Sequence, residues 1–361
     1  MIPIDFERLR SLGLTPAMAR QAALCSQEAE ENSEPAPTRL LRLVEVHRET
    51  VQLHDAEREI SARVVPALAR QFELAVGDWV LCIEDGHGQT WVRRRVPPLT
   101  HIARRDADGR RHPVVSNVDT ALLVMGLDDD FNLRRLERYL ALVHGSGVRP
   151  VVVLSKADVA AALPALLAQR LDAVRDRVGT GIEVVALDAT APSAARALAH
   201  WQGAGQTLVL LGSSGAGKST LTNTLLGSAV QDTGRVREHD SRGKHTTTSR
   251  SLHRLPGGAC VIDTPGLRAL RPDIDAATLA ASFGDIQGLA SQCRFRDCRH
   301  ADEPGCAVLA GIDTDRLRNY QKMLRESRRD TLNPHERRAQ VSVWKARSKA
   351  SRQRSKVGGD S

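Results

Sequence analysis

The sequence contains no uninterrupted apolar run long enough to cross a membrane. A spanning helix needs about 20 consecutive apolar residues, and charged residues break every apolar stretch of this 361-residue chain well before that length. The N-terminus also lacks the apolar segment of a secretory signal, since Asp5 and Glu7 interrupt it. We therefore expect a cytoplasmic protein with no membrane partner.

Cysteine is scarce, and half of the six cysteines lie in one short segment. In a cytosolic protein such a cluster indicates a metal site and not a disulfide framework. The cluster offers three thiolates and one imidazole within fourteen residues, at Cys293, Cys298, His300 and Cys306. These groups fill a tetrahedral Zn²⁺ shell and leave no position for water, which predicts one structural zinc. His300 could instead support a ligand from outside that shell.

Most of the chain carries no excess of positive charge. The net charge is +8, but between Arg316 and Lys356 fourteen lysines and arginines face only three acidic residues, so the remaining residues are slightly acidic. Such a basic segment is typical of a contact with a nucleic-acid backbone. The alternative is a solvated helix followed by a disordered tail.

Five regions follow from the composition. Residues 1–37 end in a polar, proline-containing stretch and are predicted to be a flexible leader. Residues 38–100 hold short alternating apolar stretches that predict a small β-barrel, although this spacing does not distinguish an OB-fold from other barrels. Residues 101–280 alternate apolar runs with helical patterns, as in a doubly wound parallel α/β domain. Residues 281–330 would form an α-rich zinc-binding domain, and residues 331–361 a basic arm.

Individual elements of the α/β region can be predicted as well. Five apolar runs predict buried strands at Ala121–Met125, Pro150–Leu154, Ile182–Leu187, Leu208–Leu211 and Cys260–Ile262. An apolar stripe from Leu133 to Val143 predicts a helix with Asn132 as its N-cap and Gly145 past its end. Two further helices are predicted over residues 160–178 and 193–201.

The motif with the clearest chemistry is a phosphate-binding loop. The pattern G-x-x-x-x-G-K-[ST] is matched in full, after a predicted strand and before a predicted helix, by Gly212, Ser213, Ser214, Gly215, Ala216, Gly217, Lys218 and Ser219, with Thr220 next. Glycines let backbone N–H groups surround phosphate, while the lysine reaches the β- and γ-phosphates. We expect Lys218 to act on the phosphates and Ser219 to ligate Mg²⁺.

A second motif, D-x-x-G, follows the predicted strand Cys260–Ile262. Asp263 would hold Mg²⁺ through water, and the Gly266 amide could sense the γ-phosphate. Between the two motifs lies a polar segment in which Thr246 or Thr247 could complete the Mg²⁺ shell when the γ-phosphate is present.

The base specificity is indicated by Ser155, Lys156, Ala157 and Asp158, at the end of the predicted strand Pro150–Leu154. The Asp158 carboxylate could accept both N–H groups on one edge of guanine, whereas adenine presents an acceptor there. The stem of Lys156 could cover the base. An incidental strand end is the alternative. Asp188–Thr190, after the next strand, could supply the last base contact.

The order of these motifs is unusual. The S-K-x-D motif stands about 55 residues before the phosphate-binding loop, whereas GTPases commonly place the base motif last. A circular permutation keeps the neighbouring strands together while moving the termini. The chain would then leave the GTPase core just after Gly266.

Together these residues resemble the RsgA family of circularly permuted small ribosomal subunit biogenesis GTPases. The resemblance runs from about residue 39 to residue 330 and includes Gly77–Val80, Asn117–Asp119, Phe131–Asn132, Ser155–Asp158, Gly212–Thr220, His245–Thr248, Asp263–Gly266, Cys293–His300 and Glu303–Cys306. It implies an N-terminal OB-fold, a GTPase core that uses GTP with Mg²⁺, and a C-terminal zinc domain. It also implies late maturation of the 30S subunit through contacts with 16S rRNA. Hydrolysis of GTP to GDP would be stimulated by that subunit and followed by release, and we expect a monomer.

Three positions bear on the mechanism. Ser155 stands where the family has Asn, so we expect a shorter or lost contact between base site and phosphate loop, with weaker affinity and retained guanine selectivity. Leu267 cannot orient water as a polar residue could, so hydrolysis should depend on the partner. His245 is a candidate for that orientation, or else a structural or RNA-contacting histidine.

Two other classes stay open. One is a P-loop ATPase or kinase, against which Asp158 and the motif order argue. The other is a zinc-bearing RNA-binding protein with a degenerate nucleotide site, against which Lys218, Ser219 and Asp263 argue.

Overall fold

The computed structural model describes residues 2–31, 39–106, 110–228, 250–266 and 272–330. Its chain divides into two compact units, Met1–Asp273 and Ile274–Ser361. Residue 280, the predicted end of the α/β domain, lies inside helix α9 (Ala276–Ser282) of the second unit. None of the helices in the described ranges has the length and apolarity that a membrane crossing requires.

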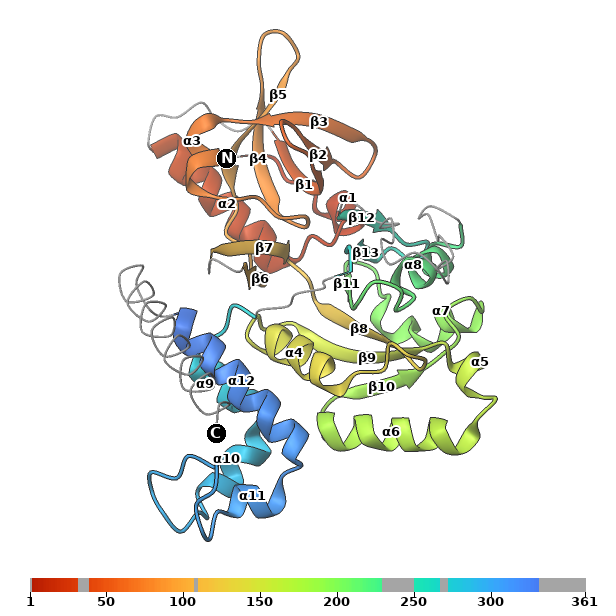
Figure 1. The fold of residues 1–361 in the computed structure, drawn as a ribbon. Coiled ribbons are helices and arrows are strands. Elements are labelled where there is room, and N and C mark those ends of the chain that lie inside the picture. The colour runs from red at the N-terminus through yellow and green to blue at the C-terminus, as the bar shows by residue number, and fades with distance from the viewer. Residues whose placement is uncertain (1, 32–38, 107–109, 229–249, 267–271, 331–361) are drawn as a thin grey trace, which may run out of the picture. The chain divides into compact units, whose positions relative to one another are not determined.

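The first unit contains a closed barrel of five strands. They are β1 (Arg39–Val46), β2 (Val51–His54), β3 (Glu59–Val64), β4 (Trp79–Glu84) and β5 (Thr90–Arg95). The strands pair in the order β1-β2-β3-β5-β4, and β4 pairs back with β1. Helix α3 (Pro66–Gln71) lies between β3 and β4 in the chain. The predicted barrel is confirmed, with the strand order of an OB-fold (Figure 1).

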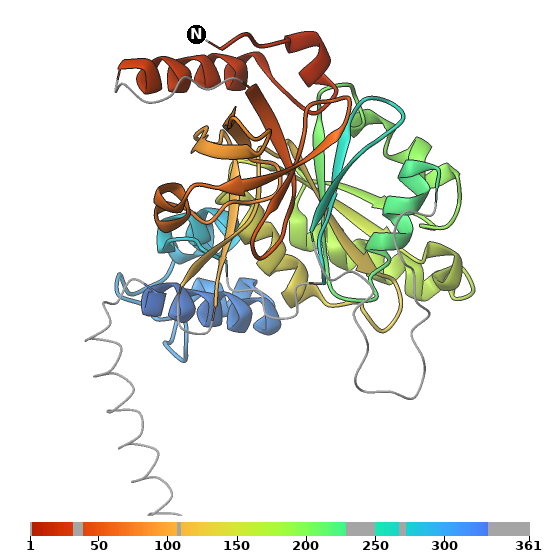
Figure 2. The same cartoon turned by 90° about the horizontal axis from the view of Figure 1, so that it is seen from above.

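The N-terminal residues do not form the predicted flexible leader. Helices α1 (Phe6–Arg10) and α2 (Pro16–Glu31) pack on the barrel, and Leu12 and Met18 share a buried cluster with Trp79 of β4. Figure 2 shows both helices beside the barrel strands. The inward positions of α2 have helical spacing, but most carry small side chains, at Met18, Ala22, Cys25 and Ala29. This weak apolar stripe explains why the composition resembles that of a linker. The rest of the predicted leader, residues 32–37, lies outside the described ranges.

The α/β part of the first unit is a six-stranded sheet in the order β10-β9-β8-β11-β13-β12. The strands are β8 (Thr120–Gly126), β9 (Arg149–Ser155), β10 (Glu183–Ala186), β11 (Thr207–Leu211), β12 (Ser251–Arg254) and β13 (Cys260–Asp263). All neighbours are parallel except β12 and β13. All five predicted strands are present, and four of them are buried as continuous apolar runs indicate. The fifth, β10, is the edge strand and is partly exposed.

Helices cover the two faces of this sheet. On one face lie α4 (Leu133–His144), α5 (Ala157–Ala160) and α6 (Pro164–Val178), and on the other lie α7 (Ser193–Ala197), the 3₁₀ turn η1 (Ala199–Trp201) and α8 (Lys218–Leu226) (Figure 1). Asn132 caps α4 as predicted, since its side chain accepts the Arg135 N–H. The helix predicted over residues 160–178 begins at Pro164, which occupies the first turn of α6 because proline lacks the N–H that a helix interior needs.

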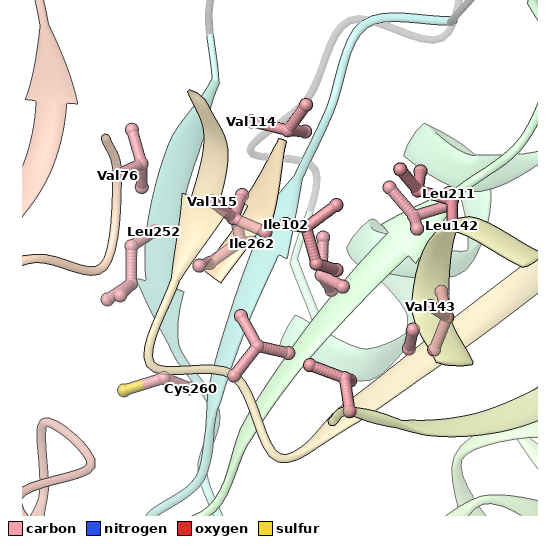
Figure 3. Close-up of a cluster of buried hydrophobic side chains, with 14 of the residues drawn as sticks. Val76, Ile102, Val114, Val115, Leu142, Val143, Leu211, Leu252, Cys260 and Ile262 are labelled. Atoms are coloured by element: carbon pink, nitrogen blue, oxygen red, sulfur yellow. The ribbon is translucent and has the colours of Figure 1, made fainter. Parts of the chain in front are cut away.

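The barrel and the α/β sheet share one core. The hairpin of β6 (His101–Arg105) and β7 (Arg111–Ser116) joins them in sequence, and Ile102 and Val115 of this hairpin belong to the same buried cluster as Leu211 and Ile262 (Figure 3). The sheet is also continuous, because Glu45 of β1 pairs with Ser251 of β12.

The second unit is helical in its described part. After α9 come α10 (Gly284–Ala290), α11 (Ala307–Gly311) and α12 (Thr314–Asp330). Phe283, Ile286, Val308 and Leu317 are buried among them. The segment between α10 and α11 carries the cysteine and histidine cluster, as expected for an α-rich domain with a metal-binding loop.

Candidate nucleotide-binding and metal sites

The phosphate-binding loop lies between strand β11 and helix α8. The strand ends at Leu211 and the helix begins at Lys218, so residues 212–217 form the turn at the helix N-terminus. Gly217 has a φ of 92°, a left-handed conformation that favours glycine. The backbone N–H groups at the start of α8 are therefore available to an anion.

Lys218 points back into this loop. Its Nζ donates to the carbonyl oxygens of Gly212 at 3.1 Å and Ser213 at 2.7 Å. Burial lowers the pKa of this ammonium group, while the charges of Asp263 and Asp130 raise it. The side chain thus lies where it could exchange carbonyl partners for phosphate oxygens.

The two expected magnesium ligands in the described residues are adjacent. Ser219 Oγ donates to Asp263 Oδ2 at 3.1 Å. Asp263 is fully buried, and burial raises the pKa of its carboxyl group. Its Oδ1 has no hydrogen-bond partner among the described residues. A buried carboxylate oxygen without a partner, next to a hydroxyl group, fits the oxygen ligands that Mg²⁺ prefers.

The D-x-x-G segment lies against the phosphate loop. A Cβ on Gly266 would lie 2.4 Å from the backbone nitrogen of Ser214, so only glycine fits there. This contact places the Gly266 amide beside the loop that would hold the phosphates. His245, Thr246, Thr247 and Leu267 lie outside the described residues, so their roles stay predictions.

Ser155 lies at the carboxyl end of β9 and is buried. Its hydroxyl group donates to the Ala216 carbonyl of the phosphate loop at 2.6 Å. Of the two predicted outcomes, a shorter or a lost contact between base motif and phosphate loop, the loss is wrong. The shorter side chain still reaches the loop because β9 approaches it closely.

The other residues of the base motif open α5. Lys156 adopts a left-handed backbone with φ of 59°, and its Nζ donates to Asp128 Oδ2 at 2.6 Å. Asp158 is exposed in the first turn of α5. The segment Asp188–Thr190, predicted to supply the last base contact, lies against α8, since Thr224 donates to the Ala189 carbonyl at 2.6 Å.

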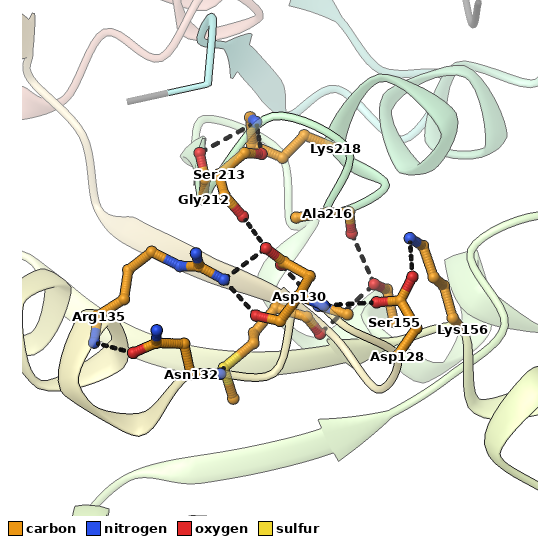
Figure 4. Close-up of polar contacts among 12 residues, drawn as sticks. Asp128, Asp130, Asn132, Arg135, Ser155, Lys156, Gly212, Ser213, Ala216 and Lys218 are labelled. Atoms are coloured by element: carbon orange, nitrogen blue, oxygen red, sulfur yellow. Dashed lines mark hydrogen bonds and ion pairs between the residues drawn. The ribbon is translucent and has the colours of Figure 1, made fainter. Parts of the chain in front are cut away.

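An acidic loop that was not predicted from the sequence, Asp128–Asp130, lies between β8 and α4. Asp130 accepts hydrogen bonds from Ser213 Oγ at 2.5 Å, from the Gly126 N–H at 3.1 Å and from the Arg135 guanidinium group (Figure 4). It therefore fixes the phosphate loop from the side of the neighbouring strand. The available signal was three consecutive aspartates directly after a buried strand, where parallel sheets place their ligands.

The cysteine and histidine cluster forms a compact set of ligand atoms in the second unit. The thiol groups and the imidazole of Cys293, Cys298, His300 and Cys306 all lie within 4.8 Å of one another. Cys293 Sγ lies 3.9 Å from Cys306 Sγ, and His300 Nδ1 lies 3.4 Å from Cys306 Sγ. Tetrahedral ligands at zinc distances would be separated by about 3.5–3.8 Å. The four residues can therefore hold a metal ion, with His300 in the ligand set.

Fold and site together define a class of protein. The phosphate loop, Asp263 and the S-K-x-D motif meet at the carboxyl ends of parallel strands, with β8, β9 and β10 preceding the phosphate-loop strand in the chain. This is the arrangement of a circularly permuted P-loop GTPase.

Comparisons with known proteins give the family. The family model described as RsgA GTPase matches residues 96–272. The chain is 46% identical over 295 residues to the small ribosomal subunit biogenesis GTPase RsgA of Xanthomonas oryzae pv. oryzae (strain PXO99A), covering 78% of this chain and 79% of that one. It is 43% identical over 336 residues to the RsgA of Xanthomonas euvesicatoria pv. vesicatoria (strain 85-10), covering 89% of each.

Solved structures agree on the fold. The crystal structure of YjeQ from Thermotoga maritima superimposes with a TM-score of 0.57 at 23% identity, over 80% of this chain and 98% of that one. YloQ, described as a circularly permuted GTPase, gives a TM-score of 0.53 at 22% identity, over 81% and 96%. The chain belongs to the RsgA family of ribosomal subunit biogenesis GTPases and is a GTP-hydrolysing enzyme.

Proposed function

We propose that this GTPase acts late in the maturation of the 30S ribosomal subunit in the cytoplasm. It binds 16S rRNA as a monomer through its barrel, zinc domain and basic arm, and hydrolysis of GTP to GDP drives its release. The main support for the proposal is that an intact phosphate loop, Asp263 and a guanine-type motif lie at the same edge of one sheet. The same chain also contains an OB-fold barrel. The names of the relatives support the small subunit as the target.

The site residues take the following roles in this proposal. Residues 212–220 enclose the phosphates, and Lys218 moves from its two carbonyl partners to the β- and γ-phosphate oxygens. Ser219, Asp263 (through water) and Thr246 or Thr247 would hold Mg²⁺, which would supply neutralisation of the phosphate charge when bound. The Gly266 amide senses the γ-phosphate, and residues 155–158 recognise guanine, with the Asp158 carboxylate as the specific acceptor. His245 orients water.

The ammonium group of Lys218 lies near two acidic side chains. Asp130 and Asp263 lie close enough to raise the pKa of its ammonium group against the effect of burial. The hydrogen bond that Ser213 donates to Asp130 holds the loop in shape.

We further propose that the metal in the second unit is one structural zinc ion. Three sulfur ligands and one imidazole suit Zn²⁺ better than Mg²⁺ or Ca²⁺, which prefer oxygen. Cys293, Cys298, His300 and Cys306 fill all four positions and leave none for a substrate.

The barrel offers a surface suited to RNA. Arg63 of β3 is exposed and pairs across the sheet with Trp91 of β5, so that a basic and an aromatic residue occupy neighbouring positions. Strands at this position of OB-folds bind single-stranded nucleic acids.

Co-sedimentation tests the proposed partner. The purified chain is centrifuged with 30S or 50S subunits in the presence of either GDP or a slowly hydrolysed GTP analogue. We expect the chain to pellet with 30S subunits in the presence of the GTP analogue and to stay in the supernatant in the presence of GDP. We expect Lys218→Ala to remove this dependence on the nucleotide. Equal pelleting with 50S would contradict the choice of partner.

A further inference from the structure

An exposed phenylalanine lies within the metal-binding loop of the second unit. Phe295 is 41% exposed and stands between the ligands Cys293 and Cys298. The backbone around it is fixed, since the Cys298 N–H donates to the Phe295 carbonyl at 3.2 Å and the Arg294 N–H donates to the Gly305 carbonyl at 3.2 Å. The segment Arg294–Arg299, here called the Phe295 loop, therefore presents its ring from a backbone that the metal ligands hold in place.

The surroundings of this ring are positively charged. The guanidinium carbon of Arg294 lies 5.5 Å from the ring centroid. Arg296 and Arg299 are exposed, and Asp297 is the single acidic residue of the loop. Among the described residues, none of these three arginines forms an ion pair. Their charges are thus available to an anionic partner.

Exposure alone does not distinguish this residue. Leu309 in the same unit is also 41% exposed, and single exposed apolar side chains are common on protein surfaces. The distinguishing features are an aromatic face, a guanidinium group over it and two further arginines on the same short loop. A planar ring with cations around it matches a nucleobase flanked by phosphates.

We propose that the Phe295 loop binds unpaired RNA, with one base stacked on the Phe295 ring and the arginines in contact with the adjacent phosphates. Bases in a duplex are covered by their neighbours, so only an unpaired base offers a free face. This inference rests on the proposed function and adds the form of RNA that the zinc domain recognises.

The test uses the full-length chain and two labelled RNA probes. One is a single-stranded RNA of about 12 nucleotides, and the other is the blunt duplex of the same sequence. Binding is followed by fluorescence anisotropy at about 300 mM KCl, where general backbone attraction is weakened. The variants are Phe295→Ala, Phe295→Leu, Phe295→Trp and the matched control Leu309→Ala, and their zinc content is measured to verify that the domain folds.

We expect Phe295→Ala and Phe295→Leu to bind the single strand roughly five- to hundredfold more weakly. Phe295→Trp and Leu309→Ala should bind the single strand as tightly as the wild type does. The affinity for the duplex should stay within twofold of the wild-type value in every variant. Replacing Arg296 by Gln lowers the slope of log affinity against log salt concentration by about 1. Wild-type affinity in the zinc-loaded Phe295→Ala variant, or full restoration by leucine, overturns the inference.

The same variants separate this inference from the proposed function. If 30S subunits stimulate hydrolysis but Phe295→Ala binds the single strand like the wild type, only the inference fails. If Phe295 governs single-strand binding but 30S gives no stimulation, the inference holds and the assignment of the subunit fails.

Discussion

Arg42 joins three parts of the first unit and is fully buried. Its Nη1 donates to the Leu12 carbonyl at 2.8 Å, and its Nη2 donates to the Asn117 carbonyl at 2.8 Å, just before β8. The guanidinium group also lies 5.1 Å from the centre of the Trp79 ring. Burial lowers the pKa of this group, and the charges of Asp78 and Asp119 oppose that effect. A single side chain of β1 thus connects the N-terminal helices with the start of the α/β sheet.

We predict that Arg42→Met destabilises the first unit by about 2–4 kcal/mol, because it leaves buried carbonyl groups without donors. The shift in the urea midpoint of unfolding measures this loss. Arg63→Met, at an exposed position of β3, is the control and should change stability by less than about 0.5 kcal/mol. Equal midpoints for the two variants would exclude a structural role for Arg42.

Ser155 provides a second test at the residue scale. Ser155→Ala removes the hydroxyl group that donates to Ala216, so we predict about fivefold weaker GDP binding. Preference for guanine over adenine nucleotides should persist, since it depends on Asp158, whereas Asp158→Asn should reduce it strongly. Competition between GTP and ATP for a fluorescent nucleotide measures both effects. Undiminished GDP affinity in Ser155→Ala would show that the contact with the phosphate loop contributes nothing.

His101 makes the stability of the first unit sensitive to acid. Burial, together with the charges of Arg95 and Arg111, lowers its pKa from 6.5 to about 4. The unfolded chain therefore binds more protons between these values, so stability is full above about pH 6.5 and is lost as the pH falls toward 4. We predict a shallower loss for His101→Gln in urea unfolding measured from pH 7 to pH 5. An unchanged profile would assign the acid sensitivity to other groups, such as His54, His144 and His253, whose pKa values burial also lowers.

At the scale of elements, the N-terminal helices are part of the folded barrel. They cover Trp79 and Leu81 of β4, which are fully buried. We predict that deleting residues 1–31 lowers the urea midpoint and increases the binding of a hydrophobic dye, because this apolar surface becomes exposed to water. Circular dichroism of the truncated chain should still show the α/β core. A truncated chain as stable as the full one would support the flexible leader that the composition suggested.

The sequence was most informative where one residue type dominates an element. The central strands β8, β9, β11 and β13 are buried on both faces and appear as continuous apolar runs, and the phosphate loop needs glycines and a lysine at fixed spacing. The helix predicted over residues 160–178 begins at Pro164 in the structure, and the short helix α5 before it was not predicted. Helix α2 was missed because most of its inward positions carry small side chains whose burial depends on the barrel.

The features of the nucleotide site that were not predicted from the sequence depend on tertiary contacts. The reach of Ser155 to Ala216 depends on how closely β9 approaches the phosphate loop. The bonds of Asp130 to Ser213 and Arg135 join segments from two strands and a helix, and no local pattern encodes them. In contrast, the four zinc-type ligands are close in sequence, so their spacing was sufficient to predict the cluster.

At the scale of the whole molecule, the permuted order determines what is connected to the nucleotide site. Strand β12 follows the segment that contains Thr246 and Thr247, and it pairs with β1 of the barrel through Ser251 and Glu45. The second unit begins at Ile274, shortly after Gly266 in the chain. Both proposed RNA-binding parts are therefore joined to segments that would respond to the γ-phosphate, as a ribosome-dependent switch requires.

The measurement that tests this account most directly is the steady-state rate of GTP hydrolysis by the purified chain, alone and with 30S subunits, 50S subunits or bare RNA. We predict slow hydrolysis alone, since Leu267 cannot orient water, and a large increase with 30S subunits only. Asp263→Asn should remove that increase. A rate that is the same in all four conditions, although GTP binds, would contradict the account of a GTPase switched by the small subunit.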